Sequence, residues 1–298
     1  MLRNKTSLIQ VFALGLLFTM SPTLWADIII NGFTDATNDR FTNSSSFIMN
    51  QFDLSGVGQD AGGKWATAIS RNVVISAYHN RPSGTISFFE TNSLAGPMVT
   101  RNIVSGMKIG STDLYLAVLD SNLPNSIKSY SYATEPLMGV PGTVTSAGIY
   151  DGLNAYLFGL SPTVHPAFSD SAVGRNIVSN YAEDEIFQGN TDNDSILFVN
   201  DAVGSPDFVP FEAMFVSGDS GGPTFVDVGG SLVLLGTNAF TFTNPNGSGI
   251  NYTGNQAAAT QNFIDVNAVP EPSSIVLTAL GLGYVSYRRS KLARRSIA

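Results

Sequence analysis

Six consecutive residues, Gly218-Asp219-Ser220-Gly221-Gly222-Pro223, surround one serine with three glycines, a carboxylate and a proline. Glycine adopts the φ > 0 conformations that other residues avoid, so we expect a tightly shaped turn here rather than a flexible spacer. Such a turn can present a serine hydroxyl while neighbouring backbone amides converge on one point, as stabilisation of an oxyanion requires. The string therefore predicts Ser220 as a nucleophile. The alternative is an ordinary glycine-rich hairpin.

A serine nucleophile needs a base to take its proton, and the chain has only two histidines. His79 follows the β-branched run Val73–Ala77, which is typical of a strand, with the histidine just past its end. His165 stands between Val164 and Pro166 and is expected in a loop. The sequence favours His79 as the base and leaves His165 a structural or merely exposed role.

The base in turn needs a group that orients its ring, and Asp113 has the most suggestive setting among the carboxylates. It opens the apolar run Leu114–Leu119, and a carboxylate that enters a core is costly unless it is hydrogen-bonded. We therefore expect Asp113 to have a buried partner. The alternative is an aspartate that only caps the strand, and Asp120 at the other end of the run fits the role less well.

Taken together, these segments resemble the trypsin-like (chymotrypsin-fold) serine proteases. The string around Ser220 resembles the family's nucleophile motif, and the residues that open with Asp113 resemble its Asp-Ile-Ala-Leu-Leu motif. The residues that end in His79 resemble its histidine motif, with Tyr78 in place of a small residue and Asn80 where many members have cysteine. The chain order His79, Asp113, Ser220 is also the chymotrypsin order.

The resemblance implies an all-β fold of two six-stranded antiparallel β-barrels, with the active site in the cleft between them. It implies a serine endopeptidase in which His79, Asp113 and Ser220 are the triad and the amides of Gly218 and Ser220 form the oxyanion hole. The partner is a protein or peptide substrate, and no metal or organic cofactor is needed.

The same resemblance places the specificity pocket at Met214, Ala239, Phe240 and Thr241. Trypsin-type enzymes have an aspartate where this chain has Met214, and Thr241 stands where open-pocket enzymes have glycine. We therefore expect a preference for small or apolar residues before the scissile bond.

The resemblance also suggests activation by a new N-terminus. Ile29-Ile30-Asn31-Gly32 resembles the start of a matured family member, whose amine pairs with the aspartate before the nucleophile. Asp219 is that aspartate here, so the expected activation pairing joins Ile29 and Asp219.

Apart from the resemblance, short apolar or alternating runs broken by Gly, Asn, Ser, Asp and Pro predict an all-β body. The expected runs include 67–77, 85–89, 114–119, 142–149, 195–199 and 232–235. The expected organisation is a signal peptide at 1–26, a protease domain at 27–266, and a sorting signal at 267–298. Within the protease domain, the first barrel is expected at about 27–125 and the second at about 139–262.

Both ends of the chain indicate export. Arg3 and Lys5 precede an apolar stretch that ends in a polar break before Ala26, which is the pattern of a signal peptide for signal peptidase. Near the other end, Pro270-Glu271-Pro272 precedes a short apolar run and a basic cluster. This tail resembles the Pro-Glu-Pro (PEP-CTERM) sorting signal of Gram-negative bacteria, which implies an exosortase-type partner. The alternative is a simple C-terminal membrane anchor, although the run is short for a full transmembrane segment. The expected location is periplasmic, cell-surface or extracellular.

Composition and charge further limit the classes of partner and ligand that we expect. The chain contains no cysteine, so no disulfide supports the fold. Residues 27–266 carry eight Lys and Arg against 22 Asp and Glu, a net charge of −14. A surface this acidic disfavours nucleic acid and anionic membranes as partners. Asp192-Asn193-Asp194 lacks the further ligands and spacing of a calcium loop, so a solvated loop is expected.

The sequence therefore predicts a secreted serine endopeptidase. An inactive protease-fold protein of the cell surface or extracellular matrix is the alternative, because Tyr78, Ala239 and Thr241 depart from the family's usual residues and a sorted surface protein need not be an enzyme.

Overall fold

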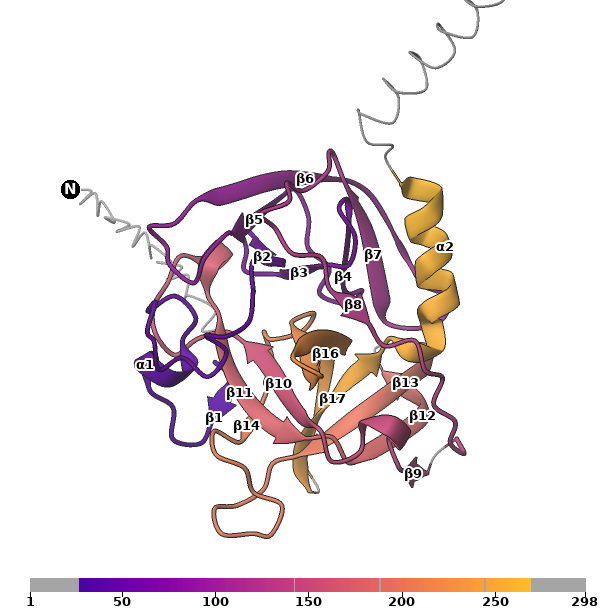
Figure 1. Cartoon of the computed structure of the whole chain (residues 1–298). Coiled ribbons are helices and arrows are strands. Elements are labelled where there is room, and N and C mark those ends of the chain that lie inside the picture. Colours follow the sequence, from indigo (N-terminus) through magenta and orange to yellow (C-terminus); the bar gives the residue numbers. More distant parts are fainter. Residues whose placement is uncertain (1–26, 142, 188, 244, 269–298) are drawn as a thin grey trace, which may run out of the picture.

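A computed structural model describes residues 27–268 apart from residues 142, 188 and 244. The signal peptide predicted for residues 1–26 and nearly all of the predicted C-terminal sorting signal lie outside the described residues. Strands dominate the described chain and form two bodies, one above the other in Figure 1.

The first body is a closed antiparallel barrel of six strands in the order β2-β3-β4-β7-β6-β5. Its strands are β2 (Val57–Asp60), β3 (Trp65–Ala68), β4 (Val73–Ala77), β5 (Thr85–Phe89), β6 (Met98–Lys108) and β7 (Leu114–Leu119). The run predicted at 67–77 proves to be parts of two strands rather than one. The Ser70 hydroxyl accepts the Val73 amide at 3.0 Å and closes a tight turn between β3 and β4.

The second body is a nine-stranded sheet in the order β11-β10-β15-β16-β17-β13-β12-β9, with β8 paired in parallel to β16. Asn176 of β11 donates to the carbonyl of Val199 in β13 at 2.8 Å, so the sheet curls until these two strands meet. Its strands are β8 (Ser131–Tyr132), β9 (Val144–Thr145), β10 (Asn154–Gly159), β11 (Ala172–Ile177), β12 (Asn180–Phe187), β13 (Asn190–Val199), β15 (Pro223–Val228), β16 (Ser231–Thr243) and β17 (Asn246–Tyr252).

The predicted fold class, all-β with two β bodies, is confirmed. The second body holds more than the six strands expected, because β8, β9 and β12 extend the sheet formed by β10, β11, β13, β15, β16 and β17. The run predicted at 142–149 contributes only the two residues of β9 before the turn η1 (Gly148–Tyr150).

The beginning and the end of the described chain each cross between the bodies. Strand β1 (Ile29–Ile30) belongs to the range expected for the first barrel, yet it pairs with β14 (Ala213–Met214) beside the second sheet. It is followed by α1 (Asp35–Asn38). After η3 (Gly254–Gln256), α2 (Ala257–Asn267) runs along the first barrel, where Asn72 donates to the carbonyl of Asn267 at 2.6 Å (Figure 1). The strand pattern did not predict this helix, which opens on three alanines.

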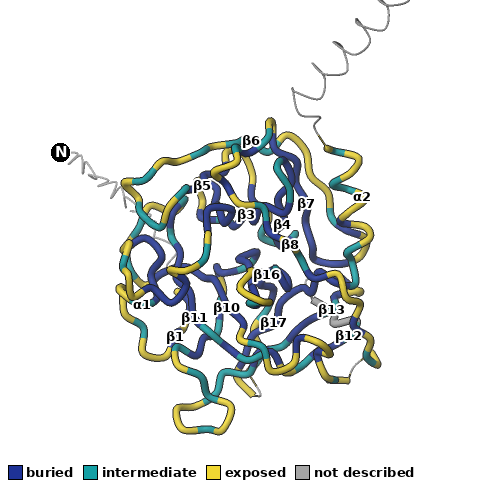
Figure 2. The backbone as a smooth tube through the Cα atoms, in the orientation of Figure 1, coloured by how far each residue is buried: buried dark blue, intermediate teal, exposed yellow. Residues whose placement is uncertain are grey.

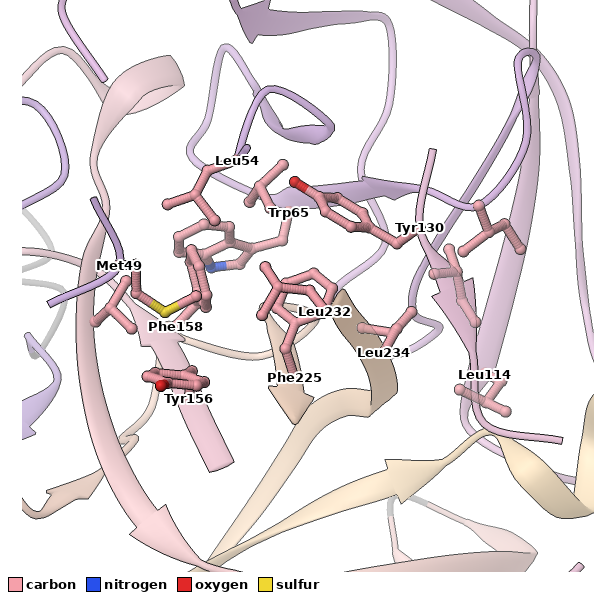
Figure 3. Packing of buried hydrophobic residues seen from close by; sticks show 14 of the residues in the cluster. Met49, Leu54, Trp65, Leu114, Tyr130, Tyr156, Phe158, Phe225, Leu232 and Leu234 are labelled. Carbon is pink, nitrogen blue, oxygen red and sulfur yellow. The ribbon is translucent and has the colours of Figure 1, made fainter. Parts of the chain in front are cut away.

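One apolar cluster spans both bodies and fixes how they meet. Figure 3 shows Trp65 of the first barrel among side chains of the second sheet, and its ring contacts Phe158 edge-on at 6.5 Å between centroids. Trp65 and Phe158 have no exposed surface. Trp65 therefore packs in the core that the two bodies share. In Figure 2 the buried stretches lie mostly toward the inside of the molecule and the exposed stretches mostly along its periphery.

Within residues 27–268, excepting the three residues not described, no helix has both the length and the apolar character needed to span a membrane.

Candidate active site

His79 is positioned by the strand before it and by one carboxylate. Strand β4 is buried throughout and ends at Ala77, so His79 leaves the barrel at its rim. Asp113 binds His79 twice: its Oδ1 accepts the His79 amide at 2.9 Å, and its Oδ2 lies 2.6 Å from the ring Nδ1. Because one carboxylate holds both the backbone and the ring, the imidazole cannot rotate freely. Its Nε2 edge faces away from Asp113.

Asp113 itself is fully buried at the start of β7 and is surrounded by three asparagines of the second body. Asn251 donates to its Oδ2 at 3.2 Å, and Asn190 donates to its Oδ1 at 3.4 Å. The side-chain oxygen of Asn193 accepts the Asp113 amide at 2.7 Å. The charge that would be costly in a core is thus stabilised by polar partners, as the sequence predicted in general terms.

These asparagines were missed at the level of sequence. Asn193 was considered only as part of an exposed acidic loop, whereas its side chain is buried against Asp113. A usable signal was present, because asparagine is depleted in strands and Asn190, Asn193 and Asn251 all lie within β13 or β17.

Ser220 lies in the tight turn that the glycines predicted. Gly218 and Gly221 have φ values of 113° and 87°, which side chains rarely tolerate. The Asp219 amide donates to the carbonyl of Val216 at 3.1 Å, and the Gly222 amide donates to the carbonyl of Asp219 at 3.0 Å. Within the described part of the chain, the amides of Gly218 and Ser220 have no acceptor. Two unsatisfied donors beside a serine suit an oxyanion hole.

Two contacts hold the Ser220 turn against the segment that carries His79. Asn80 donates to the carbonyl of Ser220 at 3.0 Å. The backbone of Gly221 abuts Ser76 of β4, since a Cβ at Gly221 would lie 2.4 Å from the Ser76 hydroxyl. The nucleophile turn and the histidine segment, far apart in sequence, are therefore in direct contact.

Asn238 of β16 holds the turn from the other side. Its side chain donates to the carbonyls of Phe158 at 2.6 Å and Asp219 at 3.2 Å, and it accepts from the Thr224 hydroxyl at 2.9 Å. The residue is fully buried. Asn238 thus fixes the position of the Ser220 turn, a role that the sequence did not predict.

A cavity of about 330 Å³ joins the predicted nucleophile, base and pocket. It is lined by His79, Asn80, Phe215, Val216, Ser217, Gly218, Ser220, Ala239, Phe240 and Thr241. The Phe240 ring packs directly against the backbone of Gly249 in β17, where a Cβ would lie 2.4 Å from the ring. No acidic side chain lines this cavity among the described residues.

Met214 is the exception among the predicted pocket residues. It is not in the cavity lining, and its backbone pairs with Ile29 in the β1–β14 sheet. The next residue, the buried Phe215, lines the cavity in its place. Of the four predicted pocket residues, the structure thus brings Ala239, Phe240 and Thr241 to the cavity but not Met214.

Asp219 is buried beneath the turn, and its carboxylate accepts the amides of Leu160 and Val216, both at 2.7 Å. Burial raises the pKa of Asp219 to about 8, and the nearby charges of Asp27 and Asp170 act in the same direction. A carboxyl in this state would gain from a positive charge placed beside it.

The structure does not bring Ile29 to Asp219. Ile29 pairs with Met214 and is 48% exposed. Its neighbour Ile28 is buried instead, and both Ile28 and Asp219 lie so close to Gly159 that a Cβ there would meet each of them within 2.7 Å. In the uncut chain Ile28 rather than Ile29 therefore lies beside Asp219, because alternation along the extended chain turns the Ile29 side chain outward.

His165 lies elsewhere, with its Nε2 2.7 Å from Oδ2 of the buried Asp39. The Ser161 hydroxyl shares that carboxylate oxygen at 2.5 Å. This group links the loop before β11 to the segment after α1, which agrees with the structural role expected for His165.

No family model matches the chain, and no curated protein matches it. Among solved structures, the chain is similar to the NS6 protease from murine norovirus 1, at 15% sequence identity and a TM-score of 0.43. The match covers 69% of this chain and 93% of that one. A similarity at this level carries no functional argument, so function must be argued from the geometry of the site.

Proposed function

We propose that this protein is a serine endopeptidase that hydrolyses peptide bonds through His79, Asp113 and Ser220. The observation that carries the proposal is the double attachment of His79 to the buried Asp113, in a cavity that Ser220 also lines. A histidine oriented in this way, lining one cavity with a serine in a tight glycine turn, suits nucleophilic catalysis by serine.

The chemistry proceeds by acyl transfer. The Ser220 hydroxyl oxygen attacks the peptide carbonyl carbon while Nε2 of His79 takes its proton, and Asp113 stabilises the imidazolium that forms. The amides of Gly218 and Ser220 bind the oxyanion. His79 then gives the proton to the leaving amine, and a water molecule repeats the two steps to release the acid and restore Ser220.

The cavity supports a preference for small or apolar residues before the scissile bond. Phe215, Val216, Ala239 and Phe240 supply an apolar lining without an acidic side chain, so Lys or Arg would have no charged partner there. Thr241 adds a side chain at the wall and narrows the space.

We propose that maturation places a new α-amine at Ile28 rather than at Ile29. The Ile28 amide donates to the carbonyl of Leu160 at 3.0 Å, and the Leu160 amide donates to Asp219, so an amine at Ile28 would lie close to that buried carboxyl. N-terminal sequencing of active protein tests this, and an active form that begins at Ile29 or later contradicts it.

Export remains part of the proposal, with signal peptidase and an exosortase-type enzyme as processing partners. It is supported by the sequence patterns at both ends of the chain. Cell fractionation followed by mass spectrometry of both termini tests it. An unprocessed protein in the cytoplasm would contradict it.

The experiment for the proposed activity is labelling by a fluorophosphonate probe, which reacts with an activated serine. Wild-type protein should be labelled, and Ser220→Ala and His79→Ala should not. Ser217→Ala is the matched control, because Ser217 lines the same cavity and should leave labelling intact. Absence of labelling in folded, processed wild-type protein would instead favour an inactive surface protein.

A further inference from the structure

Two cations gather over one aromatic ring directly beside the catalytic histidine. The guanidinium of Arg81 lies 4.7 Å from the centre of the Tyr78 ring, and the ammonium of Lys108 lies 5.4 Å from it. Arg81 also donates to the carbonyl of Tyr78 at 3.4 Å. Tyr78 and Arg81 flank His79 and Asn80 in the sequence, and His79 and Asn80 line the cavity, so this group of three residues, the Tyr78 platform, adjoins the cavity lining without being part of it.

Neither cation is paired with a carboxylate among the described residues. Residues 27–266 hold 22 acidic side chains and only eight basic ones, so two basic side chains over one ring form a local concentration of positive charge. The side chain of Arg81 is exposed and that of Lys108 is half-buried, so both can be reached from solvent. Both cations lie within 5.4 Å of the centre of the same ring, so each raises the electrostatic potential at the other.

The ring explains how the charges stay in place. An aromatic face attracts a cation electrostatically, which holds Arg81 and Lys108 near Tyr78 without neutralising either charge. An incoming carboxylate therefore meets preorganised donors in the midst of an otherwise acidic surface, which would repel it elsewhere.

We propose that the Tyr78 platform is a subsite for a carboxylate of the bound peptide, beside the scissile bond on the His79 side of the cavity. The proposal rests on the proposed peptidase function and adds a substrate class to it: peptides with an acidic group near the cleavage site. The carboxylate can belong to an acidic side chain or to a free C-terminus.

Binding to catalytically inactive Ser220→Ala protein tests the subsite without requiring turnover. Labelled peptides with glutamate at each position in turn, amidated at the C-terminus, are compared with glutamine versions. A third set carries glutamine and a free C-terminus. The best glutamate position should bind about fivefold more tightly than its glutamine match at low salt, with the difference shrinking at high salt. Tighter binding of the third set alone would assign the subsite to a terminal carboxylate.

The double variant Arg81→Gln/Lys108→Gln should abolish the preference. The control Lys64→Gln/Lys128→Gln removes the same charge, and Lys128 lines a separate hollow with Gly230 and Leu232, so it should retain the preference. Equal binding of all peptide sets, or equal losses in both double variants, overturns the subsite. Cleavage without any acidic preference would refute the subsite alone. An acidic preference in a protein that cleaves nothing would refute only the peptidase.

Discussion

The backbone of Gly221 lies so close to Ser76 that a Cβ at Gly221 would come within 2.4 Å of the Ser76 hydroxyl. Ser76 belongs to the strand that leads to His79, and Gly221 directly follows Ser220. The distance between the proposed base and nucleophile is therefore set partly by this contact between the Gly221 backbone and the Ser76 side chain. Larger residues at position 221 would separate the two bodies where they must meet.

We expect Gly221→Ala to lower kcat/KM by more than a factor of 100 and to cost roughly 1–3 kcal/mol of stability, because strain and a steric clash coincide. Gly230→Ala is the matched control. Its φ of 84° resembles the 87° of Gly221, but nothing lies within 4 Å of its Cβ position. Peptide kinetics and urea unfolding separate the two. Equal activity losses would mean that φ strain alone, not the contact with Ser76, explains the effect.

Asn251 is expected to position Asp113. In Asn251→Ala one buried donor to the carboxylate is lost, so kcat should fall about 10- to 100-fold with little change in KM. Asn246→Ala, at the exposed end of the same strand, should leave both constants unchanged. The pH–rate profile is measured alongside, because a purely structural loss would lower the rate without moving its acid limb. A change confined to KM would argue against the positioning role.

Stability should decline as pH rises from about 4 to 8. In the unfolded chain Asp219 ionises near pH 3.8, whereas burial raises its folded pKa to about 8. The contribution of Asp219 to the free energy of unfolding is thus fully present below pH 3.8. It is lost as pH rises through the folded pKa, by up to about 1.4 kcal/mol per pH unit. Asp170, whose pKa burial raises to about 6, contributes to the lower half of the same window.

Thermal melts of Ser220→Ala protein across this range measure the slope, which Asp219→Asn should flatten. The exposed Asp192→Asn serves as its control and should preserve the slope. The comparison of slopes remains informative even if Asp219→Asn lowers the melting temperature at every pH. An unchanged slope in Asp219→Asn would show that Asp219 is ionised in the folded protein at neutral pH.

A peptide panel should show faster cleavage after Ala or Leu than after Arg, because Phe215, Ala239 and Phe240 line the cavity and no acidic side chain does so among the described residues. Thr241→Gly removes a wall side chain and should increase the rate after Phe about tenfold, the scale that a few buried methylene groups provide. Thr243→Gly, further along β16 and outside the cavity lining, is the control. Preferred cleavage after Arg would refute the expected specificity.

Much of the site could be predicted because its chemistry is local in sequence. The glycines of the Ser220 turn require φ > 0, and two of them have it. Asp113 opens an apolar run, which predicted a buried polar partner, and Asn190 and Asn251 donate to its carboxylate. By contrast, the sequence did not show which side chains of an extended segment face inward. Phe215 rather than Met214 lines the cavity, and Ile28 rather than Ile29 is buried in the uncut chain.

The sequence by itself determined the all-β character, the identities of the proposed nucleophile, base and orienting carboxylate, and the tight turn around Ser220. These follow from residue type and short-range pattern, which the backbone obeys locally. Only the tertiary structure decided which asparagines surround Asp113, that Asn238 clamps the turn, and that Arg81 and Lys108 share one ring. Those relationships join residues from different strands across two bodies, and the packing of the shared core, not any local preference, brings them together.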